Sequence, residues 1–210
     1  MWKKLKVKLD NATPAQAILS FYFIAVTVSV LLLRIPAVHQ ENVKVTLMDT
    51  IFTAVSSVSV TGLSVINISE TYSTFGMFVL MFVFQFGGIG VMSLGTFFWL
   101  IFRRKIGLRG RQLIMVDHNQ TNLAGLVALI IEILKMILII EFIGAVILGF
   151  HLLKYYPSLW EALLNGLFMS VSATTNAGLD NTGASLVPYA NDYFVQLINI
   201  ILITLGAIGF

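Results

Sequence analysis

The sequence contains no cysteine, and only 11% of its 210 residues are charged. Without cysteine the chain has no disulfide framework, no thiolate metal site and no thiol nucleophile. A soluble domain typically has roughly 25% charged residues, so the low charge content excludes an ordinary soluble surface. The three histidines are far apart, and neither a zinc-protease motif nor a nucleophile elbow occurs. We therefore expect no enzyme, no catalytic residues and no cofactor.

Long apolar runs dominate what is present, since hydrophobic residues make up 58% of the chain. About 20 apolar residues cross a bilayer as a helix, and the sequence predicts four such spans, within 11–33, 71–102, 123–153 and 193–210. The first run exceeds the roughly 7 to 15 residues of a signal-peptide core, so we expect a retained helix. The predicted fold class is an all-α polytopic membrane protein.

Basic residues gather at two places, which predicts the orientation of the chain. Four lysines precede the first span, at positions 3, 4, 6 and 8, and RRKIGLRGR at 103–111 follows the second. The positive-inside bias places both segments, and with them the amino terminus, in the cytoplasm. The basic segment 103–111 is interpreted as a topology signal or anionic-lipid contact, or else as a docking site for a regulator.

Two shorter apolar segments, TLMDTIFTAVSSV and SLWEALLNGLFMSVSA, lie in the stretches predicted to be outside. They are too short to span a bilayer and are typical of buried or re-entrant helices. Thr46 with Asp49, and Ser158 with Glu161, have the spacing of a capping box. Pro157 supports the second helix start.

The chain repeats itself. TAVSSVSVTGL and MSVSATTNAGL align Gly62 with Gly178 at an offset of 116, and GGIG at 87–90 answers GAIG at 206–209. The predicted order is helix, short helix, glycine loop, helix, first in residues 1–112 and again in 113–210. The final helix ends within its apolar run, so we expect the chain to be a fragment.

The glycine loops VTGL and NAGL have the features that an ion pore needs. Non-helical backbone at membrane depth must be buried by protein or line a water-filled cavity, and carbonyl oxygens can replace the hydration shell of potassium. Gly62 and Gly178 permit the positive φ of such a turn. Each short helix would also direct its negative carboxyl end toward the membrane centre. Asp180, two residues after Gly178, is expected at the outer mouth.

Through SVSVTGL, FQFGGIGV, RRKIGLRGR and SATTNAGLDNTG, the chain resembles the Ktr/Trk/HKT family of potassium transporters, most closely the Ktr-type membrane subunit. The resemblance implies tandem repeats of helix, pore helix, filter loop and helix (M1-P-M2), four of which surround one pore. It implies a selectivity filter in which the backbone of Val60, Thr61, Asn176 and Ala177 coordinates potassium beside the two loop glycines. A serine at the position of Gly62 is associated with sodium passage in plant relatives, so the glycine favours potassium.

The resemblance also implies partners and a location. A multi-pass subunit in the cell membrane would pair as a homodimer, contact lipid, and dock on a cytosolic nucleotide-binding regulatory ring. The third and fourth repeats of the full-length chain are absent from this sequence, and with them the gating loop. Whether transport depends on sodium, as in a symporter, is left open.

Other interpretations stand beside the pore. The chain is alternatively a non-conducting helical assembly subunit in which both loops are buried turns, or a secondary transporter with broken helices. Glu132 and Lys135 are expected to pair on one helix face. Glu141 lies deeper and acts either in inter-helix hydrogen bonding or in ion coupling or gating. The GGIG and GAIG motifs are interpreted as close-packing sites rather than hinges.

Overall fold

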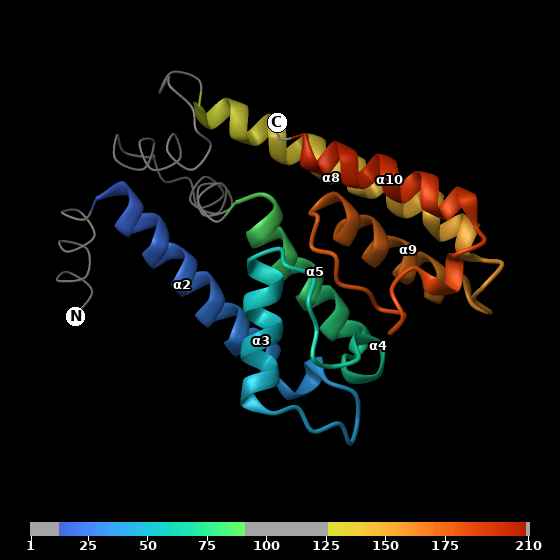
Figure 1. Ribbon diagram of the computed structural model, residues 1–210, viewed down its shortest axis with the longest axis horizontal. Helices are drawn as coiled ribbons and strands as arrows, with labels where there is room; N and C mark the ends of the chain where they lie inside the picture. The colour runs from blue at the N-terminus through green and yellow to red at the C-terminus, as the bar shows by residue number, and fades with distance from the viewer. Residues whose placement is uncertain (1–12, 91–125, 209–210) are drawn as a thin grey trace.

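A computed structural model describes residues 13–90 and 126–208, and the regular elements in these two ranges are helices (Figure 1). The all-α prediction is confirmed for this part of the chain. The elements are α2 (Pro14–Leu33), η1 (Pro36–Val38), α3 (Leu47–Val58), α4 (Ile68–Thr71), α5 (Thr74–Gly88), α8 (Leu126–Leu152), α9 (Leu159–Thr174), η2 (Val187–Tyr189) and α10 (Tyr193–Ala207).

Two helices are long and apolar enough to cross a membrane, over Ala15–Leu33 and Ala128–Leu152. In the described ranges, α5 and α10 are apolar helices of 15 residues each. The lysines of the amino terminus, the basic segment 103–111 and the predicted boundary between residues 112 and 113 lie outside the described residues.

The longer helices follow the same order in both described ranges, although the short elements η1, α4 and η2 between them do not correspond. A long helix (α2 or α8) precedes a shorter one (α3 or α9), a loop follows, and a further apolar helix begins (α5 or α10). The shorter helices differ at their starts. Thr46 and Asp49 form the predicted capping box, with reciprocal bonds of 3.2 and 3.0 Å. The hydroxyl of Ser158 instead accepts the N–H of Trp160, so Glu161 completes no box at the start of α9.

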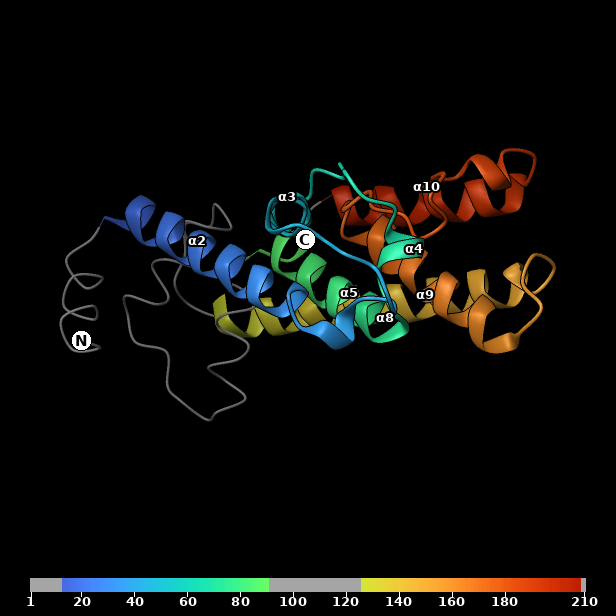
Figure 2. The same cartoon turned by 90° about the horizontal axis from the view of Figure 1, so that it is seen from below.

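One hydrophobic core joins the two ranges. Helix α5 packs against α2 and α3 and also against α9 (Figures 1 and 2). The rings of Phe84 and Phe168 meet edge to face with centroids 5.5 Å apart, and the buried side chains of Ala177 and Leu179 belong to the same cluster. The loop after α9 is therefore held against the helices of the first half.

Helices α8 and α9 approach closely at two glycines. A Cβ added to Gly166 would lie 2.6 Å from the Cα of Gly149. Small residues at such a crossing allow the backbones to touch, which is common between membrane helices. Near the other end of α8, Glu132 and Lys135 form the predicted ion pair at 2.8 Å with both side chains exposed.

Candidate functional site

The loop after α3 begins with a hydrogen-bonded reversal of the chain. The N–H of Val60 donates to the carbonyl of Ser57 at 3.4 Å, and the N–H of Thr61 donates to the carbonyl of Ser56 at 2.9 Å. This pair of bonds is a Schellman motif, which requires a left-handed residue just past the helix end. Val60 fills that position with φ of 55°.

The loop after α9 repeats the same main-chain pattern. The N–H of Asn176 donates to Ala173 at 3.1 Å and the N–H of Ala177 donates to Ser172 at 2.9 Å, while φ of Asn176 is 57°. Hydroxyls also correspond: Ser59 and Thr175 donate to the carbonyls four residues earlier, at 2.6 and 2.7 Å. The two loops therefore have one geometry despite different side chains.

A left-handed valine is costly. Glycine and asparagine enter this region readily, whereas a β-branched residue there is an outlier. Residues held in such regions cost about 1–3 kcal/mol each and concentrate at functional sites. The sequence contained a signal for Asn176, because asparagine before a small residue and glycine is typical of a turn, but none for Val60.

Gly62 and Gly178 have φ of 77° and 69°, two residues after the first left-handed position of each loop. Every second residue is thus left-handed, since Thr61 and Ala177 are not among the positive-φ residues. Successive carbonyls of an extended strand point to opposite sides, and reversing alternate φ angles turns them toward one side. The positive φ that was predicted for both glycines is confirmed.

The two loops touch at their glycines. A Cβ added to Gly62 would lie 3.0 Å from the carbonyl oxygen of Ala177 and 3.2 Å from the Cα of Gly178. Gly62 therefore lies against Ala177 and Gly178, although the two loops are 116 positions apart in the sequence. In the described part of the chain, the carbonyl oxygens of the six predicted filter residues accept no hydrogen bond.

The glycine motifs of the following helices pack against these loops. A Cβ on Gly87 would lie 2.5 Å from the carbonyl oxygen of Val58, and a Cβ on Gly206 would meet the carbonyl oxygen of Thr174. These two carbonyls end α3 and α9 and correspond at the offset of 116. The interpretation of GGIG and GAIG as close-packing sites is therefore confirmed for Gly87 and Gly206.

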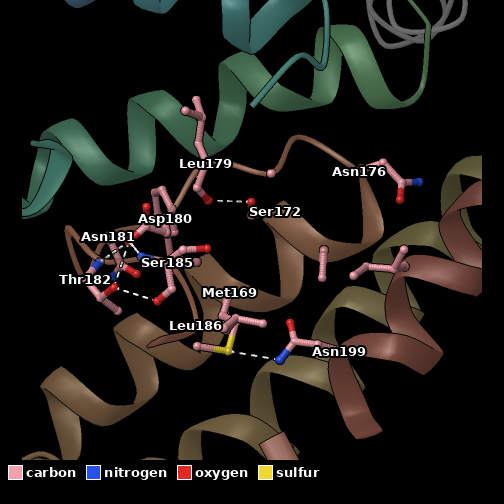
Figure 3. A pocket seen from close by; sticks show the side chains of 14 residues that line it. Met169, Ser172, Asn176, Leu179, Asp180, Asn181, Thr182, Ser185, Leu186 and Asn199 are labelled. Atoms are coloured by element: carbon pink, nitrogen blue, oxygen red, sulfur yellow. Dashed lines mark hydrogen bonds between the residues drawn. The ribbon is translucent and has the colours of Figure 1, made fainter. Parts of the chain in front are cut away.

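A cavity of about 250 Å³ lies between the second loop, α9 and α10 (Figure 3). Polar side chains in its lining include Ser172, Asn176 and Asn199. Asp180 also lines it, and its carboxylate accepts the N–H groups of Thr182 and Ser185 at 3.0 and 2.9 Å. Asp180 thus organises the loop beyond Gly178.

Glu141 is buried at 4% exposure within α8. The side-chain nitrogen of Gln85, on α5, donates to its carboxylate, and the hydroxyl of Ser170 donates to its backbone carbonyl at 2.8 Å. Intramembrane carboxylates are usually paired or functional. These contacts agree with the interpretation of Glu141 as an inter-helix hydrogen-bond residue.

Two apolar helices long enough to cross a bilayer, and two loops with one main-chain geometry, are the features of a helical membrane protein with an internal repeat. Residues 3–210 match the TrkH family profile, described as a cation transport protein, and the chain belongs to this family.

The chain is similar to several curated proteins. It is 56% identical to Ktr system potassium uptake protein D of Bacillus subtilis (strain 168) over 202 residues. The matched segment covers 96% of this chain and 45% of that protein. The chain is 32% identical over 205 residues to Ktr system potassium uptake protein B of the same organism, covering 97% and 45%. Identity to Ktr system potassium uptake protein B of Vibrio alginolyticus is 30% over 205 residues, covering 97% and 44%. The chain spans about half the length of these relatives.

Proposed function

We propose that this chain forms part of a potassium uptake protein of the cell membrane, in which the two glycine loops select the ion. The observation that carries the proposal is the shared geometry of the loops, with left-handed residues at Val60 and Gly62 and again at Asn176 and Gly178. Membership of a cation transport family and similarity to proteins named for potassium uptake support the choice of ion.

In this proposal, main-chain carbonyls of Val60, Thr61, Asn176 and Ala177 replace water around potassium. Carbonyl oxygens without a hydrogen-bond donor are available for this role. The last turns of α3 and α9 lie beside the loops, and each helix end contributes about half a negative charge. A membrane potential supplies about 2.3 kcal/mol per charge per 100 mV, which is enough to accumulate potassium without further coupling.

The proposed topology follows the distribution of basic residues. The chain crosses the membrane several times, its amino terminus is cytoplasmic, and α3 and α9 enter from outside. Two further repeats of the full-length protein complete the ring of carbonyls. A homodimer, and a cytosolic nucleotide-binding ring that gates the pore, are supported by the family resemblance.

Serine in place of each loop glycine tests the filter. Gly62→Ser and Gly178→Ser in the full-length protein should reduce the preference for potassium over sodium, measured as uptake in a host that lacks its own potassium transport. Gly183→Ser is the matched control, because Gly183 is also left-handed at φ of 76° but lies beyond the filter residues. The backbone strain of this control is similar, its added Cβ meets only the side chain of Asn67, and its ion preference should be unchanged.

Unchanged uptake and preference in both loop variants would contradict the filter and favour a non-conducting assembly subunit. A preference that changes equally in the Gly183→Ser control would assign the effect to folding strain.

A further inference from the structure

The two loops contain identical residues with different partners. Ser56 aligns with Ser172, and Leu63 aligns with Leu179. The hydroxyl of Ser172 donates to the carbonyl of Leu179 at 2.6 Å, which ties the end of the second loop back to α9 (Figure 3). The hydroxyl of Ser56 is buried and has no hydrogen-bond partner among the described residues.

The leucines differ in the same way. Leu179 is 3% exposed and packs in the core shared by both halves, whereas Leu63 is 58% exposed. The second loop is therefore anchored by a side chain and a hydrogen bond at one residue, directly after Gly178. The first loop has neither anchor at the corresponding place.

A second connection holds the second loop only. The side-chain nitrogen of Asn181 donates to the side-chain oxygen of Asn165, and Asn165 in turn donates to the backbone carbonyl of Glu161 at 2.8 Å. Asn181 is 5% exposed. The aligned residue in the first loop is Val65, which has no polar side chain to make such a bond.

The cavity beside the second loop gives these bonds their importance. Since an open volume of about 250 Å³ adjoins Ser172 and Gly178, close packing does not fix the loop from every side. Protein interiors otherwise hold backbone in place by dense contact. Two hydrogen bonds supply that restraint: the Ser172 hydroxyl donates to the carbonyl of Leu179, and the Asn181 side chain donates to the side-chain oxygen of Asn165.

We propose that Ser172 and the Asn165–Asn181 pair are positioning residues that hold the second loop rigid and so set ion preference. The inference rests on the proposed filter function. One mechanism by which a carbonyl site rejects sodium is by resisting closure around the smaller ion. The first loop has a side-chain bond between Ser59 and Thr61 at 2.6 Å but no counterpart of the bonds at Leu179 and Asn181. The segment after the glycine is therefore held more firmly in the second loop, which we infer contributes more discrimination than the first.

The test compares Ser172→Ala with Ser56→Ala in the full-length protein, expressed in a host that lacks its own potassium uptake. The readout is the ratio of potassium to sodium uptake, which does not depend on how much protein reaches the membrane. Ser172→Ala should lower this ratio about tenfold, equivalent to about 1.4 kcal/mol. Ser56→Ala should change it less than about twofold, because that hydroxyl makes no bond to lose.

Two further variants separate positioning from simple loss of folding. Ser172→Thr keeps a hydroxyl and should preserve the ratio. Asn165→Ala removes the second connection without touching Ser172, and should lower the ratio in the same direction. If Ser172→Ala fails to accumulate, the Asn165→Ala result decides the question.

Equal ratios in Ser172→Ala and Ser56→Ala would overturn the inference, as would an unchanged ratio in both Ser172→Ala and Asn165→Ala. The glycine variants distinguish this failure from failure of the filter itself. If Gly62→Ser and Gly178→Ser alter ion preference but the positioning variants do not, only the positioning role of Ser172 and the Asn165–Asn181 pair is wrong. If the glycine variants also leave preference unchanged, the filter is wrong.

Discussion

The side-chain nitrogen of Gln85 lies 2.8 Å from each carboxylate oxygen of Glu141. This contact joins α5 to α8, so it ties the last described helix of the first half to the first described helix of the second. Both residues lie in apolar helices, where water cannot replace a lost partner.

Gln85→Ala should therefore destabilise the fold. It leaves the buried Glu141 carboxyl without its side-chain donor, and an unsatisfied buried group costs about 1–3 kcal/mol. The measurement is thermal unfolding of the purified protein in detergent. Glu132→Gln, in the helix α8 that carries Glu141, is the control. The Glu132 side chain is 69% exposed, and surface changes usually alter stability by no more than about 0.5 kcal/mol. Equal melting temperatures for the two variants would refute the prediction.

The crossing of α8 and α9 predicts unequal effects of two alanine substitutions. A Cβ at Gly166 meets the backbone of Gly149 and lies 3.0 Å from the carbonyl oxygen of Ala145, whereas a Cβ at Gly149 first meets the side-chain tip of Leu163. Backbone cannot move aside, so Gly166→Ala should cost about 1–3 kcal/mol as overpacking does. Gly149→Ala should cost less, because the Leu163 side chain can change rotamer and the nearest backbone atom, the Cα of Leu163, is 3.1 Å away. A reversed order of melting temperatures would show that the crossing can spread apart.

His39 predicts a loss of stability in mild acid. Its ring stacks on Tyr72 with centroids 5.7 Å apart, and burial, with a smaller contribution from Arg34, lowers the pKa of His39 below its ordinary 6.5. The unfolded chain then binds the proton more tightly, so stability should fall as the pH drops below about 6.5. His39→Phe keeps a stacked ring that cannot titrate. The melting temperature of this variant should fall less between about pH 7 and pH 5, and identical slopes would count against the prediction.

Asp192 joins the end of α8 to the start of α10. One carboxylate oxygen lies 2.6 Å from Nζ of Lys154, 2.8 Å from Nε2 of His151 and 2.9 Å from the hydroxyl of Tyr155. The other accepts the N–H of Phe194 at 3.2 Å and caps α10. The Lys154 ammonium, followed by the other donors, holds the pKa of Asp192 well below its usual range.

A depressed carboxyl pKa adds stability above the unfolded value, here 3.8, and loses it as the pH falls. Asp192→Asn should therefore melt below the unaltered protein at neutral pH, and the gap should narrow as the pH drops below 3.8. Asp192→Ala should melt lower still, because it also removes the cap of α10. A gap between Asp192→Asn and the unaltered protein that stays constant with pH would exclude the charge as its cause.

Several features were predictable because local sequence determines them. The repeat alignment identified both loops, and the positive φ of Gly62 and Gly178 follows from the freedom of glycine. The capping box of Thr46 and Asp49 depends on residues three positions apart, so its spacing alone predicts it. The long helices α2 and α8 were also predictable, because a run of apolar residues is a local property of the sequence.

The rest depended on contacts between distant residues. Gln85 and Glu141 are 56 positions apart, and no periodicity indicates which polar side chain meets a buried carboxylate. Ser56 and Ser172 occupy the same repeat position, yet only Ser172 forms a bond, because the following loops pack differently. Ser158 shows that local spacing alone can also mislead: Glu161 lies three residues on, as in a capping box, but no capping box forms.

The main-chain bonds that close α3 and α9 have one further consequence. Thr61 and Ala177 donate at the same distance of 2.9 Å to corresponding carbonyls, while seven of the twelve aligned residues around them differ. These bonds are made by the main chain, so no substitution other than proline removes their donors. The side chains of the two loops can therefore differ while the main-chain bonds that shape each loop stay the same.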